Sequence, residues 1–552
     1  MKALSPQDAG FLYLERSNQP MHVGGLHLYS LPADAGEGYI AELIESWRRG
    51  PFEPPFNQKL VWPLRRLGQP AWVRDAEIDA EYHLRHSALP SPGRYREMFA
   101  LVSRLHGTLL HRDRPLWEAH LIEGVESNQF ALYTKMHHAM IDGMGGMRLL
   151  QRALSTDPDR RDMVPPWALG RRKRGAGSAG NALSLGGLRS IAEQVGETVG
   201  AVPGAVKGML AYADAMRHAN DDGLASPFRV PRTPLNSRIG AARRFVAQSW
   251  KIERIRAAGK ALDATLNDMV LAMSAGALRR WLIAHAELPR TPLSAMAPVA
   301  LTPKDADDYG NAVSAILCSL ATNIEEPVAR LQAIQRSMNQ GKALLQSLSR
   351  AEIMLLTTLG AVPTALPLVL GLGHRLPPFN VVISNVPGPR ERLYWNGARL
   401  DGMYPVSIPA NGVALNITVT SYVDSLDFGL IACRRSVPSA QRLIDYLEEA
   451  LAELEQAAGI PTPTQAAAGP VPQATARKPT AAAAKARPAT KKSPAKAGGS
   501  AAATSQAGTG RSGGASGRAA AGKSSGAKAK SAGGAGRAKA ATSRRRKAPA
   551  KS

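Results

Sequence analysis

Apolar and polar side chains along the first 160 residues follow two periods, one of two positions and one of three to four positions. The period of two predicts strands at residues 22–30, 117–125 and 130–138. The longer period predicts helices at residues 39–50 and 96–110. Strands interspersed with helices indicate a mixed α/β unit, which we expect to end near residue 160.

Residues 236–460 repeat this mixture of strand and helix patterns. Alternating or continuously apolar stretches predict strands at residues 242–252, 379–387, 413–423 and 426–435. Helical spacing predicts helices at residues 266–286, 328–348 and 439–458. The segment between the two units, 161–235, is basic and glycine-rich at first and weakly amphipathic afterwards, so we interpret it as a crossover linker. The sequence therefore predicts two α/β halves, 1–160 and 236–460.

The last segment, 461–552, carries 19 Lys and Arg and no Asp or Glu, which leaves 50 basic and 44 acidic residues in the rest of the chain. It consists almost entirely of small residues, Pro and cations, so it cannot bury a core and we expect it to be disordered. Spaced cations suit an anionic membrane, a lipid-granule surface or nucleic acid. The alternative is an extension that only improves solubility.

Two features indicate the compartment. Cys318 and Cys433 are the only cysteines, too few for a disulfide framework, and acidic residues precede any long apolar run at the N-terminus, so we expect a cytoplasmic protein.

Residues 353–373 hold no charge and are long enough to span a bilayer. Pro363 and Pro367 interrupt them, which favours a buried or membrane-surface helix pair over a span and leaves peripheral association with a membrane open.

The stretch KMHHAMIDGMGG, residues 135–146, lies at the junction of the predicted strand 130–138 and a helix predicted at residues 143–154, GMGGMRLLQRAL. A zinc site would need further ligands and a different spacing of histidines, and a phosphate loop would need Lys and Ser or Thr after its last glycine. A general base fits better, because an imidazole titrates near neutral pH and an acid one turn later can hold the loop. The alternative is two loop histidines whose hydrogen bonds are satisfied by their surroundings and which have no role in catalysis.

Further motifs help to choose between these interpretations of the histidine pair. The chain opens with LSPQDAGFLYLERSNQPMHVGG and continues with PLW at residues 115–117, Asn–Asp at 267–268 and NVPGP at 385–389. Together with HHxxxDG they resemble the bacterial wax ester synthase/diacylglycerol acyltransferase family over nearly all of residues 1–460. The HxxxD core alone is less specific, since the wider coenzyme A-dependent acyltransferase superfamily shares it. The basic tail departs from the family pattern.

The resemblance implies two chloramphenicol acetyltransferase-like halves with mostly antiparallel sheets around a central tunnel, where acyl-CoA meets diacylglycerol or a long-chain alcohol. It implies that His138 is the general base, with His137 beside it, and that Asp142 holds the loop before Gly143. The base takes the hydroxyl proton, the oxygen attacks the thioester, and CoA leaves as the thiol, so neither a metal nor another cofactor is required. Asn267 is the candidate donor to the oxyanion.

The remaining motif residues have packing as their default role, with tunnel lining as the alternative; they are Pro115, Leu116, Trp117, Asp268, Asn385, Pro387, Gly388 and Pro389. Two other functions stay open at this point. One is acyl transfer to a different lipid or polyketide hydroxyl by the same fold. The other is a non-catalytic role at a lipid granule or the nucleoid, carried by the tail.

Overall fold

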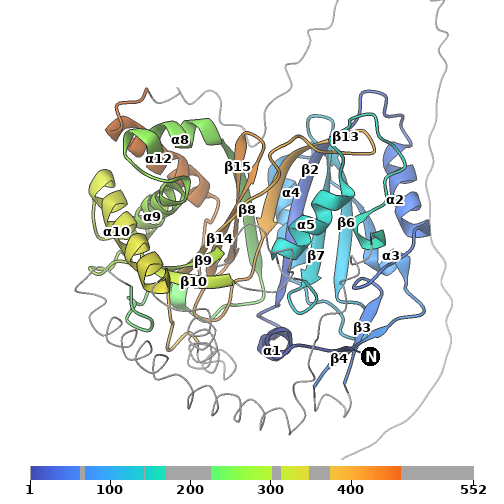
Figure 1. Ribbon diagram of the computed structural model, residues 1–552, viewed down its shortest axis with the longest axis horizontal. Helices are drawn as coiled ribbons and strands as arrows, with labels where there is room; N and C mark the ends of the chain where they lie inside the picture. The colour runs from blue at the N-terminus through green and yellow to red at the C-terminus, as the bar shows by residue number, and fades with distance from the viewer. Residues whose placement is uncertain are drawn as a thin grey trace, which may run out of the picture. The chain divides into compact units, whose positions relative to one another are not determined.

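The computed structural model describes residues 2–62, 69–141, 143–169, 225–300, 313–346 and 373–461. The described part holds two six-stranded sheets with helices packed on them, and one small sheet (Figure 1). The predicted tail, most of the predicted linker and all but the last residue of 353–373 lie outside the described residues. No helix among those described is long and apolar enough to cross a membrane.

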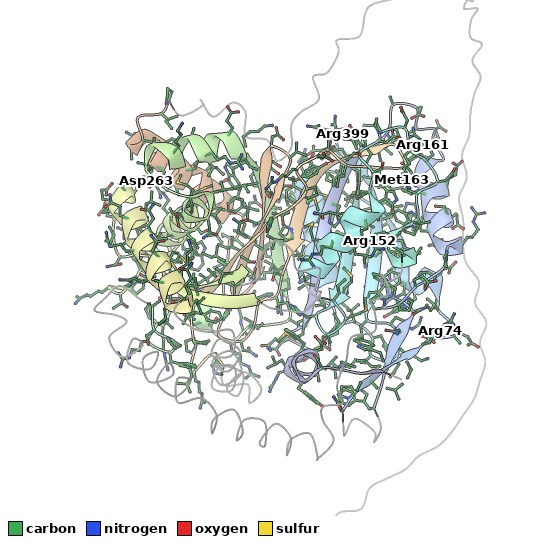
Figure 2. All side chains as sticks on the ribbon, in the orientation of Figure 1. Arg74, Arg152, Arg161, Met163, Asp263 and Arg399 are labelled. Atoms are coloured by element: carbon green, nitrogen blue, oxygen red, sulfur yellow. The ribbon has the colours of Figure 1, made fainter. Side chains whose placement is uncertain are left out.

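The first sheet has the strand order β12-β13-β2-β7-β6-β5, and all neighbours are antiparallel except β5 and β6. Its strands are β2 (His22–Ser30), β5 (Leu84–Ala88), β6 (Trp117–Val125), β7 (Gln129–His137), β12 (Tyr394–Trp395) and β13 (Ala398–Val406). Two strands from the second predicted half thus complete the sheet of the first. Figure 2 shows Arg161 and Met163 at the same end of this sheet as Arg399, and the Met163 N–H donates to Asn396 Oδ1 at 2.8 Å.

The second sheet has the order β10-β9-β11-β14-β15-β8, in which β11 is parallel to both of its neighbours and the other pairs are antiparallel. Its strands are β8 (Arg243–Lys251), β9 (Ser294–Ala300), β10 (Val313–Ser319), β11 (Val381–Val386), β14 (Leu415–Tyr422) and β15 (Ser425–Cys433). A small third sheet joins β1 (Lys2–Ala3), β4 (Ala71–Arg74) and β3 (Gln58–Val61). Both large sheets are mixed and mostly antiparallel, as expected.

The described helices are α1 (Pro6–Leu14), α2 (Tyr39–Arg49), α3 (Ala80–His83), α4 (Tyr95–His106), α5 (Gly143–Ala153), α8 (Ile252–Ala261), α9 (Leu266–Ala284), α10 (Pro327–Gln346) and α12 (Arg442–Ala457), with short 3-10 turns η1 (Pro166–Ala168) and η2 (Pro234–Asn236). The last four α-helices gather on one face of the second sheet and share its core (Figure 1). On the first sheet, α2, α5 and η1 pack on one face.

Helix α4 covers the other face of the first sheet and joins the two halves. Met98, Phe99 and Val102 of α4 share a core with Phe245 of β8 and Ile431 of β15, which belong to the second sheet.

The strands and helices that the sequence predicted within the described residues are confirmed to within a few residues of their ends. The sequence patterns did not predict α1, α3, α8, β1, β3, β4, β5, β9, β10, β12 or β13.

Candidate active site

The HHxxxDG stretch lies where the sequence predicted it, between a strand and a helix. Strand β7 ends at His137, and α5 begins at Gly143. The backbone between them is tied on both sides: the His137 N–H donates to Leu116 O at 2.9 Å, and the His138 N–H donates to Met21 O at 2.9 Å. The loop is therefore fixed by the start of β6 and by the segment that leads into β2.

The His137 ring is fully buried, and both of its nitrogens face a fixed group. Nδ1 accepts a hydrogen bond from the Ala139 N–H at 3.0 Å, so the ring proton is assigned to Nε2. Nε2 lies 3.3 Å from Glu15 Oε2, in an ion-pair contact with a carboxylate whose side chain is only 3% exposed. An imidazole held in this way has no lone pair left to take a substrate proton, which points to an anchoring role for His137.

The carboxylate of Glu15 is held in turn by Arg112, whose Nε and Nη2 donate to Oε1 at 3.1 Å and 3.0 Å. Burial alone would raise the pKa of Glu15, but the contacts of its carboxylate with His137 and with the Arg112 guanidinium outweigh burial and lower the pKa. Glu15 is therefore ionised at neutral pH and keeps its acceptors available to the loop.

The His138 ring is only half-buried and stacks on Phe11 of α1, with the ring centroids 3.9 Å apart and the planes at 19°. An aromatic face on one side fixes the plane of the imidazole, and the residue keeps intermediate exposure although its Nδ1 is buried. Asp142 lies outside the described residues. Gly143 is exposed, and a Cβ there would meet no described atom within 4 Å, so we find no steric reason for glycine at this position.

The PLW motif supports the loop by packing. Its three residues are buried, and Leu116 supplies the carbonyl that holds the His137 N–H. The Trp117 ring stacks on His83 with 4.7 Å between centroids, and its Nε1–H donates to Phe56 O at 2.8 Å. These contacts occupy the polar edge and one face of the indole.

The Asn–Asp motif begins helix α9. Asp268 forms a capping box with Thr265: its backbone N–H donates to Thr265 Oγ1 at 3.2 Å, and its carboxylate accepts from the Thr265 N–H at 3.0 Å. Asn267 lies half-buried in the first turn of the same helix. Helix α9 packs on α8, α10, α12 and β11, so the structure describes no contact of Asn267 with the histidine loop, and its oxyanion role stays a prediction.

The NVPGP motif closes the end of β11 against β14. A Cβ on Gly388 would lie 2.0 Å from Ser421 O, so only glycine fits there. The Val423 N–H donates to Pro389 O at 3.0 Å, while Asn385 is half-buried and Pro387 is exposed. The motif forms the end of β11 and the residues after it, and it keeps β11 in close contact with β14.

A polar cavity of about 610 Å³ lies beside the loop and is lined by residues from α1 to β7, including Glu15, Arg112, Glu118 and Lys135. The Lys135 ammonium is 3.0 Å from Glu118 Oε2, and both side chains are more than nine-tenths buried. Sequence patterns did not single out these four residues. Glu15 lies inside the opening block LSPQDAGFLYLERS, which was the one available signal for it.

Comparisons with known proteins agree over the whole described part. Residues 4–270 match the family model described as "Wax ester synthase/diacylglycerol acyltransferase catalytic domain", and residues 309–455 match "WS/DGAT C-terminal domain". A probable diacylglycerol O-acyltransferase of Mycobacterium tuberculosis is 45% identical over 464 residues, which cover 83% of this chain and all of that protein. The O-acyltransferase WSD of Acinetobacter baylyi is 41% identical over 455 residues, 81% of this chain and 96% of that protein.

Among solved structures, a wax ester synthase/diacylglycerol acyltransferase from Marinobacter aquaeolei VT8 is similar to this chain with a TM-score of 0.67 and 44% sequence identity. The similarity covers 83% of this chain and all of that one.

Proposed function

This chain belongs to the wax ester synthase/diacylglycerol acyltransferase family, and we propose how its residues carry out the transfer of an acyl group. It is an O-acyltransferase that moves a long-chain acyl group from acyl-CoA to the hydroxyl of diacylglycerol, of a long-chain alcohol, or of both. The products are triacylglycerol and wax ester.

His138 is the general base in this proposal. The observation that supports it is the unequal setting of the two adjacent histidines: the His137 ring is fully buried, with Nδ1 accepting from the Ala139 N–H and Nε2 3.3 Å from the Glu15 carboxylate, whereas the His138 ring is half-buried and stacked on Phe11. A partly exposed imidazole with a fixed ring plane can be in line with a substrate hydroxyl, and a fully buried one whose lone pair is occupied cannot.

In the proposed reaction, His138 is the single group that accepts and returns the proton. His138 accepts the proton of the acceptor hydroxyl, and that oxygen attacks the thioester carbonyl and forms a tetrahedral oxyanion. The carbon–sulfur bond breaks as the carbonyl reforms, and the imidazolium returns its proton to the sulfur of CoA. Asn267 is the proposed donor to the oxyanion, and Asp142 is proposed to hold the loop without contacting substrate.

The test is an assay of the purified protein with palmitoyl-CoA and either diacylglycerol or hexadecanol, read by thin-layer chromatography. We expect His138→Ala to lower turnover toward the upper end of the 10²–10⁴-fold range for loss of a general base. His137→Ala should lower it less, because the anchored loop is loosened but the base remains. Equal and mild losses in the two variants would reject His138 as the base.

The location of the enzyme is part of the same proposal. We place it in the cytoplasm, attached peripherally to an anionic membrane or lipid-granule surface, because its substrates partition there and segment 461–552 carries 19 cations without an acid. Deleting this segment should leave turnover on dispersed substrate unchanged and abolish salt-sensitive co-sedimentation with anionic vesicles. If the deletion removes binding to duplex DNA and leaves vesicle binding intact, the segment serves nucleic acid instead.

A further inference from the structure

One carboxylate oxygen supports both histidines of the loop. Oε2 of Glu15 lies 3.3 Å from His137 Nε2 and also accepts a hydrogen bond from the Met21 N–H at 3.3 Å. The carbonyl of the same Met21 accepts the His138 N–H at 2.9 Å. Glu15 therefore holds the ring of one histidine directly and the backbone of the other through a single residue.

The other oxygen of Glu15 is fixed from the opposite side. Arg112 donates twice to Oε1, and its Nη2 also donates to Leu12 O at 2.8 Å, close to the end of α1. Two guanidinium N–H groups that converge on one oxygen fix the position of that oxygen more firmly than a single bond would. The position of Oε2, and with it the position of the loop, is set by this ion pair.

These contacts also fix the proton on His137. With the carboxylate at Nε2, the ring proton belongs on that nitrogen, which leaves the Nδ1 lone pair for the Ala139 N–H. If the proton moved to Nδ1, two N–H groups would face each other and the turn after His138 would lose its support. A carboxylate that selects the tautomer of an adjacent imidazole has the same effect in metal sites and in hydrolytic triads.

We propose that Glu15, held by Arg112, is a positioning residue that fixes the tautomer of His137 and the backbone at His138, and so aims the His138 imidazole at the acceptor hydroxyl. The inference rests on the proposed function of His138. Glu15 does not touch the reacting atoms, so its effect is on turnover and not on the binding of either substrate.

The principal variant is Glu15→Gln, which keeps the shape of the side chain. A single amide oxygen can serve either Arg112 or the pair formed by His137 and Met21, and the NH₂ group then faces N–H donors on the other side. We expect kcat with palmitoyl-CoA and hexadecanol to fall roughly 10–100-fold, the usual effect of losing an orienting partner, while both KM values stay within about twofold. Arg112→Lys, which keeps the charge but not the double contact, should give a smaller fall in the same direction.

The second half of the chain offers a matched control. Glu455 is a glutamate with a side chain 1% exposed that accepts from Arg254 Nε at 2.6 Å and from Nη2 at 2.8 Å. It joins α12 to α8 and has no part in the histidine loop. Glu455→Gln should lower the melting temperature and leave kcat unchanged, which separates positioning from general loss of stability.

A double-variant cycle tests the route through His137. His137→Asn keeps an oxygen near the Nδ1 position that can accept the Ala139 N–H, but it cannot reach Glu15. If Glu15 acts on turnover through His137, the double variant should be no slower than the slower single variant. Additive losses in log kcat would overturn the route through His137, because Glu15 would then act only through Met21.

A readout without turnover keeps this inference separate from the proposed function. In protein labelled with ¹⁵N-histidine, the His137 signals are identified by their loss in His137→Asn, and we expect the Nε2–H tautomer in the parent and an altered signal in Glu15→Gln. The Glu455→Gln spectrum should match the parent. Unchanged His137 signals in Glu15→Gln would overturn the positioning role, whereas full activity of His138→Ala would overturn only the proposed base.

Discussion

Lys135→Met tests the buried charge cluster beside the active loop. Lys135 is two residues before His137 in β7, and its side chain is 1% exposed. Its Nζ donates to Leu105 O at 3.1 Å and to Thr108 O at 3.2 Å, and lies 3.0 Å from Glu118 Oε2. The ammonium therefore satisfies carbonyls at the end of α4, where a positive charge also suits the helix dipole.

The expected loss of unfolding free energy follows from the groups that lose a partner in Lys135→Met. Methionine fills the space but removes a donor from the Leu105 and Thr108 carbonyls, of which Leu105 O keeps the Thr108 N–H as a partner, and it removes the closest cation from Glu118. Breaking a buried ion pair on one side typically costs 3–5 kcal/mol. The polar cavity lined by Glu118 and Lys135 lets water reach these groups, so we expect the lower end, about 3 kcal/mol, or a fall of roughly 3–6 °C in melting temperature for a folded chain of this length.

The assay is thermal and urea unfolding of the parent and three variants. Lys251→Met is the control, because Lys251 pairs with Asp424 in a contact where both side chains are more than half exposed, and such pairs contribute about 0–1 kcal/mol. The double variant Lys135→Met/Glu118→Gln should be less destabilised than the sum of the two single variants, since it contains no stranded charge. A Lys135→Met variant as stable as Lys251→Met would refute the reasoning.

The pKa of Glu118 gives the pH dependence of the same cluster. Burial alone would raise it, but the hydrogen bond with His120 and the charges of Lys135 and Arg85 lower it to about 2. A carboxyl whose folded pKa is below its unfolded pKa contributes stability that is present above the unfolded value, near 4.5, and is lost as the pH falls toward 2.

Three further outcomes are expected. Between pH 5 and pH 2 the unfolding free energy of the parent should fall by about 3 kcal/mol more than that of Glu118→Gln, as measured by urea titration at each pH. Gly388→Ala should destabilise the fold by about 1–3 kcal/mol or more, because its Cβ would lie 2.0 Å from a carbonyl of β14, whereas Gly143→Ala should change the melting temperature little. Thr265→Ala should cost about 1 kcal/mol by removing the α9 cap, while Asn267→Ala should keep stability and, as the proposed oxyanion donor, lower kcat roughly 10²–10³-fold.

Elements with one clear period could be predicted from the sequence. Strands β6 and β7 and helices α9 and α12 each keep one pattern over nine or more residues, and the structure places them within a few positions of the prediction. In each case the local pattern agrees with the environment that the fold provides.

Strand β13 shows why other elements could not be predicted from the sequence. It pairs with β2, more than 370 positions earlier in the chain, and it contains Pro405, which argues against a central strand. The proline is tolerated because its partner on β2 is Gly25, which has no side chain. On β15, only glycine fits at position 429, because a Cβ there would lie 1.9 Å from the Pro405 carbonyl oxygen. Two glycines far away in sequence make the strand possible, and no local pattern shows that relation.

The same limit applies to the active loop. The sequence singles out His137 and His138 as a pair and offers no reason within the pair to divide their roles. The division follows from strand geometry, because successive side chains of a strand point to opposite faces. His137, the last residue of β7, shares a face with Lys135 and points to Glu15, whereas His138 follows the strand and meets Phe11.

Two adjacent histidines at a strand end can therefore provide an anchor and a base at once. The anchor needs a buried carboxylate, and Glu15 lies 122 positions before His137, so its role becomes visible only when α1 and the turn after it fold over the loop. Because the anchor requires a specific protonation state, Nε2–H on His137 beside an ionised Glu15, the geometry of the loop depends on a charge that the base itself does not carry. A chain in which Glu15 is neutral would keep the whole HHxxxDG motif and still present His138 less accurately, which is why the motif alone is an incomplete description of this site.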